Sequence, residues 1–308
     1  MPKVTICTPT KNAESTIERT ANSVLSQTYD DWTMLVLDNG STDNSIDILD
    51  RLFRKAGRQE KLKVFSDENL NLSEARHFLS STGDSEYIAV LDADDQFRPD
   101  KLERQLWIMD KESDISLCGS AAIWFREHKL GRLNYDEVIR TFRPAQYQYP
   151  RLDTFNLVHA SIPHSSFFMR RADYEKVGGY RPYHHVTHDH DLMLRLSDIG
   201  LVFCDKEPLI RYLVHDNAIS ALKRRDQVQN AIVSYANLFL RRINEPELTE
   251  VIPEEEVFIY LKNIGRAKEA KTLRLFFEQY LKSMMRKRHT NISKISRINS
   301  IKNLTIKC

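Results

Sequence analysis

The sequence predicts an α/β fold in which a mostly parallel sheet is flanked by helices. Over the first hundred residues, short β-rich apolar runs alternate with stretches of helical periodicity. Such alternation indicates βαβ units with right-handed crossovers. The apolar run Tyr87–Leu91 ends abruptly in Asp92, Asp94 and Asp95, as expected where a buried strand reaches the edge of a sheet. At 308 residues, the chain is also long enough to bury a large core.

Each expected element rests on its apolar spacing. Strands are expected at Val4–Thr8, Trp32–Leu37, Leu62–Phe65, Tyr87–Leu91, Ile115–Ser120, Ser165–Arg170, Leu201–Cys204 and Leu209–Leu213. Helices are expected at Ala13–Gln27, Asp43–Phe53, Ser73–Ser80, Lys101–Lys111, Arg171–Val177 and Asp189–Leu196, and from Arg224 onward the pattern is purely helical. Ile17, Ala21 and Val24 mark the buried side of the first helix, and Ser41 or Thr42 is the expected cap of the second.

Composition places the chain among soluble globular proteins, with 41% hydrophobic and 29% charged residues. Its net charge of +2 conceals an asymmetry, because residues 262–308 alone carry 13 Lys or Arg and only two acids. The four cysteines are scattered without metal-binding spacing, which favours a reducing cytoplasm. No segment approaches the ~20 apolar residues of a membrane span, and the N-terminus lacks a signal-peptide pattern.

Polar groups follow several expected strands and should meet at one edge of the sheet. They are Thr8–Asn12 after the first strand, Asp38–Ser41 after the second, Asp92–Asp95 after the fourth, and Arg76 on the third helix. In open α/β sheets, ligands bind outside the carboxyl ends of the strands. Asp92 and Asp94 have the i, i+2 spacing that projects two side chains the same way from an extended segment. Their hard oxygen ligands suit Mg²⁺ or Mn²⁺.

Each of these residues also has a structural alternative. The acidic triplet could be a turn leading into the helix after Pro99, Asn12 could cap a helix, and Asp38 could form an Asx-type turn with Asn39-Gly40. For Asp189 and Asp191 the alternative is helix N-capping. The four nearby histidines 184, 185, 188 and 190 also leave open a transition-metal site, although no regular ligand spacing is present.

Taken together and in order, these segments resemble the inverting GT-A glycosyltransferases of family 2, over about residues 3–220. The resemblance is carried by Val4–Asn12, Ser23–Tyr29, Val36–Asp43, Asn71–Arg76, Leu91–Asp95, Phe168–Arg171, Val177–Tyr180 and Asp189–Leu196. It implies a GT-A fold with a Rossmann-like sheet and a catalytic domain at 1–220. That domain would comprise a nucleotide-binding half (1–98) and an acceptor-binding half (99–220), followed by a helical basic C-terminal region (221–308).

The resemblance also implies a role for each matching residue. Nucleotide-sugar binding would fall to Thr8, Pro9, Thr10, Asn12, Asp38, Arg76, Asp92, Ala93 and Asp94. The metal, Mn²⁺ or Mg²⁺, would be held by Asp94 with Asp92, Asp95 and His215. Asp189 would be the catalytic base, with Asp191 as runner-up. The sequence departs from the family at His188, where Glu is usual, at Leu213, where many relatives have Arg, and at His77, where Asn is common.

The expected activity is therefore metal-dependent, inverting transfer of a sugar from a nucleotide-diphosphate sugar, most readily a UDP-sugar. The acceptor would be a glycan or a lipid-linked molecule in surface polysaccharide synthesis. The basic segment from Lys282 to Lys307 suggests peripheral contact with the inner face of the cell membrane, and no nucleic acid partner is expected. Alternatives are a sugar-1-phosphate nucleotidyltransferase, which should have a glycine-rich loop after the first strand, and a non-catalytic nucleotide-sugar-binding protein.

Overall fold

The structure is a computed structural model that describes residues 1–130, 133–142, 162–215, 223–275 and 277–278. Its strands are β1 (Val4–Thr10), β2 (Trp32–Asp38), β3 (Leu62–Ser66), β4 (Tyr87–Val90), β5 (Gln96–Phe97), β6 (Ile115–Leu130), β7 (Leu133–Phe142), β8 (Phe168–Arg170) and β9 (Leu201–Leu213). Its helices are α1 (Ile17–Leu25), α2 (Ser45–Lys55), α3 (Leu72–Thr82), α4 (Lys101–Lys111), α5 (Arg171–Lys176), α6 (His188–Leu196), α8 (Arg224–Arg242) and α9 (Glu254–Asn263). Short 3₁₀ turns occupy Gln59–Lys61 and His164–Ser166.

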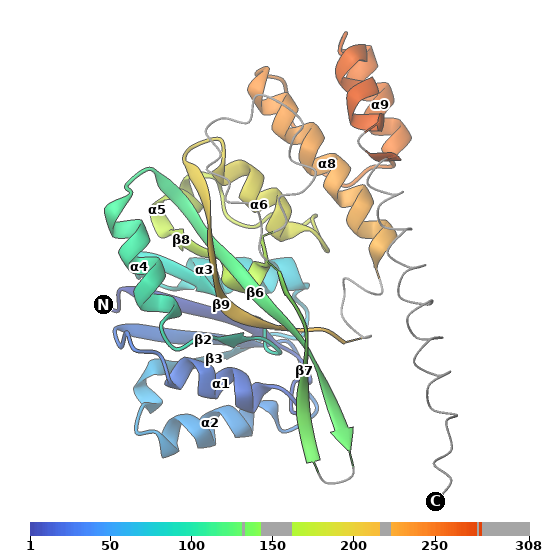
Figure 1. The fold of residues 1–308 in the computed structure, drawn as a ribbon. Helices are drawn as coiled ribbons and strands as arrows, with labels where there is room; N and C mark the ends of the chain where they lie inside the picture. Colours follow the sequence, from blue (N-terminus) through green and yellow to red (C-terminus); the bar gives the residue numbers. More distant parts are fainter. Residues whose placement is uncertain (131–132, 143–161, 216–222, 276, 279–308) are drawn as a thin grey trace, which may run out of the picture. The chain divides into compact units, whose positions relative to one another are not determined.

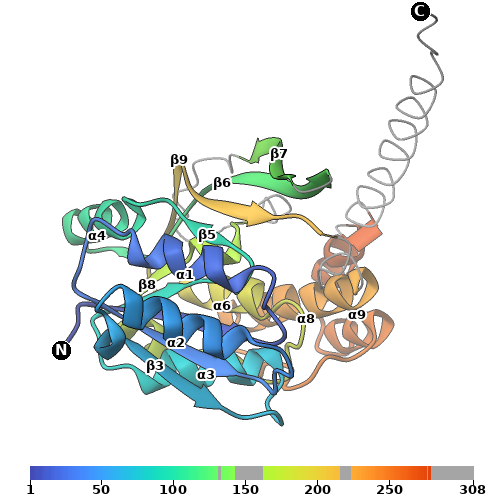
Figure 2. The same ribbon diagram turned by 90° about the horizontal axis from the view of Figure 1, so that it is seen from below.

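The described strands form one sheet in the order β3–β2–β1–β4–β8–β6–β9–β5, with β7 paired to β6. In the first half, β3, β2, β1 and β4 are all parallel. Helices α1 and α2 cover one face of this half and α3 lies on the other (Figures 1 and 2). Every residue of β1 is buried, as are Ile17, Ala21 and Val24 of α1. Since the parallel strands end together, β1, β2 and β4 deliver their polar termini to one edge, as the sequence predicts.

The second half of the sheet is mixed and differs from the sequence-based boundaries. Strand β8 is antiparallel to both β4 and β6, and β6 is parallel to β9. Strand β6 runs ten residues past the predicted end at Ser120, into a hairpin with β7 that projects from the sheet (Figure 1). The two strands predicted between Leu201 and Leu213 are one, because β9 pairs with β6 along its length. The polar residues Asp205–Glu207 interrupt the apolar pattern, so the sequence predicts two strands. In the structure, Asp205 forms an ion pair with Arg104 of α4.

Two local predictions at loops are corrected. Ser165 and Ser166 lie in a 3₁₀ turn, so the strand begins only at Phe168. Neither Ser41 nor Thr42 caps α2, whose N-cap is Asn44. Both residues instead bind the loop after β1. The Asn12 backbone N–H donates to Ser41 Oγ at 3.0 Å, and the Thr42 N–H donates to Asn12 Oδ1 at 2.8 Å. These bonds fasten the loops after β1 and β2 to each other.

The chain divides into two compact units, Met1–Val251 and Ile252–Cys308. Helix α8 belongs to the first unit and α9 to the second. In the described part of the chain, no helix combines the length and hydropathy needed to traverse a bilayer. The basic segment from Lys282 to Lys307, on which the predicted membrane contact rests, lies outside the described residues. Residues 143–161 lie outside them as well.

Candidate active site

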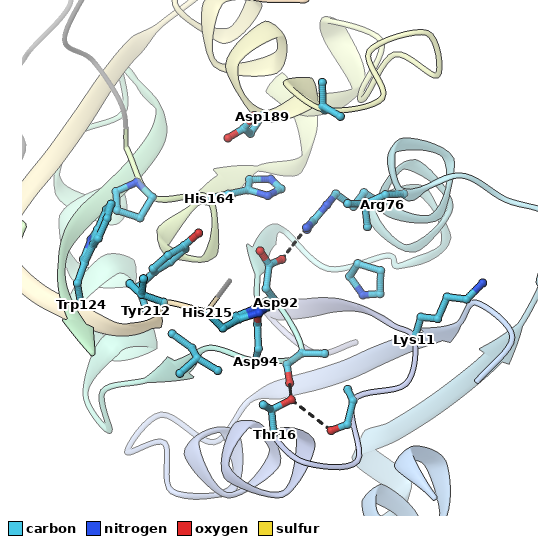
Figure 3. A pocket seen from close by; sticks show the side chains of 18 of the residues that line it. Lys11, Thr16, Arg76, Asp92, Asp94, Trp124, His164, Asp189, Tyr212 and His215 are labelled. Atoms are coloured by element: carbon cyan, nitrogen blue, oxygen red, sulfur yellow. Dashed lines mark hydrogen bonds and ion pairs between the residues drawn. The ribbon is translucent and has the colours of Figure 1, made fainter. Parts of the chain in front are cut away.

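A cavity of about 960 Å³ lies where the strands end. It is lined by residues following β1, β4 and β9, by the start of α6, by Arg76 of α3 and by residues of β6 (Figure 3). Of the residues predicted from sequence, Pro9, Asn12, Arg76, Asp92, Ala93, Asp94, Asp189 and His215 line it. Side chains up to about 200 residues apart therefore share one hollow of the size that small-molecule ligands occupy.

The acidic strand end forms the centre of the cavity. Asp92 Oδ1 lies 2.6 Å from Arg76 Nη2, and Asp94 Oδ2 lies 3.0 Å from His215 Nε2. Asp95 is buried, and both of its oxygens accept hydrogen bonds, from Ser165 Oγ at 2.5 Å and from the Leu213 N–H at 2.9 Å. Burial, reinforced by the charges of Asp94 and Asp92, raises the pKa of the Asp95 carboxyl well above its usual range. Three acids are thus crowded at one strand end, with Arg76 beside Asp92 as the charged partner.

This arrangement fits a divalent cation. Asp92, Asp94 and Asp95 each offer an oxygen within 4.8 Å of the others, and among the residues that the structure describes no other group of three His, Cys, Asp or Glu does so. The histidine-rich loop therefore forms no metal cluster of this kind. Asp94 is 34% exposed and has His215 beside it (Figure 3), and both side chains line the cavity. Asp95, which is buried, fixes the strand end through its hydrogen bonds with Ser165 and Leu213.

Arg76 supplies the positive side of the cavity. Helix α3 is fixed by a capping box in which Asn71 accepts from the backbone and Glu74 bonds back. Only 5% of Arg76 is exposed, and besides Asp92 its guanidinium has two buried donors, Nε and Nη1, without a partner. Buried donors in native proteins are nearly always bonded. These two donors therefore leave hydrogen-bonding capacity beside the cavity that no described protein group satisfies.

Asp189 lies across the cavity from Asp94, in the first turn of α6 (Figure 3). Burial raises the pKa of its carboxyl, and the charge of Asp92 adds to this, while a backbone hydrogen bond at His190 and the charge of Arg76 oppose it. His164 and His188 also line the cavity, and burial and the charge of Arg76 lower the pKa of both rings. His164 Nε2 is bonded to Tyr180 Oη at 2.8 Å. A carboxylate with a raised pKa facing a cavity is suited to accept a proton.

Asp191, the other acid considered for catalysis, does not line the cavity. It is 1% exposed and sits in an ion cluster, with Oδ2 2.6 Å from Arg195 Nη2 and Oδ1 3.4 Å from His184 and 3.6 Å from Arg181. Burial opposes ionisation, but the His184 hydrogen bond and the charges of Arg195 and Arg181 hold the pKa of Asp191 far below its usual range. These contacts give Asp191 a structural role, so we do not propose it as the catalytic base.

We expect Asp191→Asn to lower the free energy of unfolding by about 3–5 kcal/mol at neutral pH, because the substitution leaves buried arginine charge uncompensated. Since the folded pKa is depressed, the stabilisation is present above pH ~4 and is lost as the pH falls through the folded pKa. Urea denaturation at pH 7 and pH 3 measures both effects. Asp50→Asn is the control, because Asp50 forms an exposed pair with Arg54 worth less than ~1 kcal/mol. Equal losses in the two variants would contradict the prediction.

The first two strand ends match the prediction only in part. Pro9 and Asn12 reach the cavity, but Thr8 and Thr10 are buried within β1 and do not line it. Asp38 does not line it either, and its Oδ1 accepts from the Ser41 N–H, three residues on, at 2.9 Å, a local hydrogen bond across Asn39-Gly40. Lys11 also lines the cavity, as expected of the loop Thr8–Asn12, whereas the sequence reasoning missed Thr16, Trp124, His164 and Tyr212 as cavity residues. Thr16 lies close to that loop in sequence, so proximity to it was the available signal.

Comparison with known proteins gives three findings. The sequence model of a family described as "Glycosyl transferase family 2" matches residues 5–178, more than half of the chain. TuaG of Bacillus subtilis, whose name provisionally assigns it to teichuronic acid biosynthesis as a glycosyltransferase, is 36% identical over 119 residues, covering 38% of this chain and 46% of TuaG. Among solved structures, S. aureus TarS 1–349 in complex with UDP-GlcNAc superposes with a TM-score of 0.56 at 14% identity, covering 91% of this chain and 92% of that one.

A second structure with the same fold is the mannosyltransferase PcManGT from Pyrobaculum calidifontis, in complex with GDP-Man and Mn²⁺. It has a TM-score of 0.54 at 16% identity and covers 88% of this chain and 74% of the other. At these identities the likeness shows a common fold.

Proposed function

The chain belongs to glycosyl transferase family 2 and is a glycosyltransferase of GT-A fold, and from that premise we propose that it transfers a sugar from a nucleotide-diphosphate sugar with inversion at the anomeric carbon. The observation that carries the proposal is the single cavity that brings together Arg76, the acidic strand end and Asp189. The nucleotide complexes of the two solved structures above support a sugar nucleotide as donor, and a UDP-sugar is favoured.

In this proposal the donor lies between α3 and the acidic strand end. The unpartnered Nε and Nη1 of Arg76 donate to oxygens of the nucleotide, while Pro9 and Asn12 border the base and ribose. Asp94 and His215 hold Mn²⁺ or Mg²⁺, with Asp92 and Asp95 beside them. When bound, the cation supplies Lewis-acid stabilisation of the charge that develops on the departing diphosphate. Thr8, Thr10 and Asp38 shape the strand ends behind these contacts.

Asp189 is the proposed general base. Inversion requires the acceptor hydroxyl to attack from the face opposite the leaving group, and a base on that face must accept its proton. Asp189 faces the cavity from α6, away from Asp94 on the β4 end (Figure 3), as such a base must. Its raised pKa makes it a better proton acceptor than an ordinary carboxylate. Burial and the charge of Arg76 lower the pKa of nearby His188 and His164, which makes both rings weaker bases than an ordinary imidazole.

We also propose a domain organisation, an acceptor and a location for this enzyme. We assign residues 1–98 to donor binding and 99–220 to acceptor binding, with the helical region from 221 onward as an accessory part. The acceptor is a glycan or lipid-linked molecule in surface polysaccharide synthesis, in keeping with the name of TuaG. The protein acts in the cytoplasm at the inner face of the membrane, held by its basic C-terminal residues, and nucleic acid has no part in it.

A donor-turnover screen tests the proposed function. Purified protein is incubated with UDP-, GDP- and dTDP-sugars and Mn²⁺, with and without chelator, and release of nucleoside diphosphate is measured. We expect metal-dependent release from one nucleotide class. Release of pyrophosphate from a nucleoside triphosphate and a sugar 1-phosphate would instead identify a nucleotidyltransferase, and no turnover of any donor would contradict the proposal.

Arg76→Lys should raise the donor KM by about ten-fold or more, since one ammonium cannot replace two fixed guanidinium donors. The matched control is Arg171→Lys. Arg171 is also buried, but it donates to the carbonyl groups of Ser80 and Ser85 outside the cavity. We expect the control to lower thermal stability and leave the donor KM unchanged. An unchanged donor KM in Arg76→Lys would remove Arg76 from the donor site.

A further inference from the structure

Two aromatic side chains form a wall of the cavity that the roles above leave unused. Trp124 of β6 and Tyr212 of β9 are direct partners in the parallel register, so their side chains leave the sheet on the same face. Their ring centroids are 5.2 Å apart at an interplanar angle of 34°. Both residues line the cavity and both are only partly buried. They therefore present a nearly continuous aromatic surface in a cavity that is also lined by charged side chains.

The surface extends across a third strand. Arg140 of β7 is the register partner of Trp124, and its guanidinium lies 4.0 Å from the centroid of the Trp124 ring system. Three planar groups thus stand in a row across β7, β6 and β9. A cation over an indole ring is an attractive contact and steadies the ring in place. The aromatic pair is consequently pre-organised for a ligand with a flat apolar face.

The wall is on the opposite side of the cavity from Arg76 and Lys11 (Figure 3). Arg76, the proposed donor contact, therefore lies away from this wall. The wall is also tied to the reacting centre, because the next residues of the same segment bind the acidic strand end: the Leu213 N–H donates to Asp95 and His215 contacts Asp94. A group resting on Trp124 and Tyr212 is held at a fixed place relative to the departing diphosphate.

We propose that Trp124 and Tyr212 form the acceptor subsite and that the acceptor is a carbohydrate, with the C–H face of one sugar ring stacked on the two aromatic rings. Pyranose rings combine an apolar face with a polar rim, which matches an aromatic platform surrounded by charged side chains. A lipid chain would need a lining free of charged groups, whereas Arg126 and Glu127 line this cavity close in sequence to Trp124. The inference deepens the proposed function and rests on it.

The test separates acceptor from donor kinetics. Transfer to a panel of p-nitrophenyl glycosides of glucose, galactose and N-acetylglucosamine is measured for the wild type, Trp124→Ala, Trp124→Phe and Tyr212→Ala. We expect Trp124→Ala to raise the acceptor KM about ten-fold while the donor KM changes by less than about two-fold, and Trp124→Phe to recover most of the loss. Tyr212→Ala should likewise raise the acceptor KM. Trp107→Ala is the matched control, since Trp107 is 60% exposed on α4, outside the cavity.

A binding measurement keeps this inference distinguishable from the proposed function. Quenching of tryptophan fluorescence by methyl β-glycosides should occur in the wild type and in Trp107→Ala, and should be lost in Trp124→Phe. If no donor is turned over but this quenching pattern holds, the saccharide platform stands and the proposed function fails. If Trp124→Ala raises the donor KM instead, the ring stacks on the nucleobase and the inference is overturned. Unchanged quenching in Trp124→Phe also overturns it.

Discussion

Replacing Asp189 with Asn should lower kcat for sugar transfer by about 10²–10⁴-fold, the contribution typical of a general base. The amide has nearly the same shape but cannot accept the proton of the acceptor hydroxyl. The donor KM should change little, because Asp189 is the group on the acceptor side of the cavity. Asp47→Asn is a close control, since Asp47 is also an acid in the first turn of a helix, but it is exposed on α2. A transfer rate within ten-fold of wild type in Asp189→Asn would exclude the assigned role.

The same carboxyl should govern the acidic limb of the pH profile. Only its deprotonated form can act as a base, and its pKa is raised by burial. Activity should therefore fall on acidification at a higher pH than an ordinary aspartate would give, and the limb should disappear from the residual rate of Asp189→Asn. The kcat/KM profile reports this pKa for the free enzyme. An acidic limb that is identical in the variant would assign it to another group.

Removing the cation ligand should have an effect of comparable size. Asp94→Asn should reduce donor turnover by roughly 10³-fold, because charge on the leaving diphosphate would lose several kcal/mol of stabilisation. Chelator should abolish turnover by the wild type, and added Mn²⁺ or Mg²⁺ should restore it. Asp100→Asn is the control: it follows the same acidic strand end but pairs with Arg98. Full turnover in the presence of chelator would contradict the assignment of a metal ion to this site.

Sequence reasoning predicted cavity residues correctly where a residue lies at the end of its own strand or helix. Asp94 and Asp189 line the cavity because an apolar run stops and a helix begins there, and a parallel sheet brings such points together. It did not predict which polar residues have local partners and stay outside the cavity. Asp38 and Asp191 have the right residue type and position, yet one closes a turn and the other balances two arginines. Only the side-chain partners distinguish these cases.

The aromatic wall lay beyond the reach of sequence reasoning for another reason. Trp124 and Tyr212 are neighbours only through the pairing of β6 with β9, and that pairing follows from neither residue type nor local periodicity. The same holds for His164, whose position depends on a 3₁₀ turn that looks like the start of a strand in the sequence. Long-range register, rather than local propensity, decides which residues complete the cavity.

Strand β9 bears on attempts to exchange specificity between relatives. The segment that carries Tyr212 also donates a backbone hydrogen bond to Asp95, which is held in turn by Ser165. A chimera that imports only this strand would disturb the acidic strand end along with the acceptor wall. The two are therefore not separable modules, and a functional graft would have to move β6, β9 and the Ser165 turn as one block.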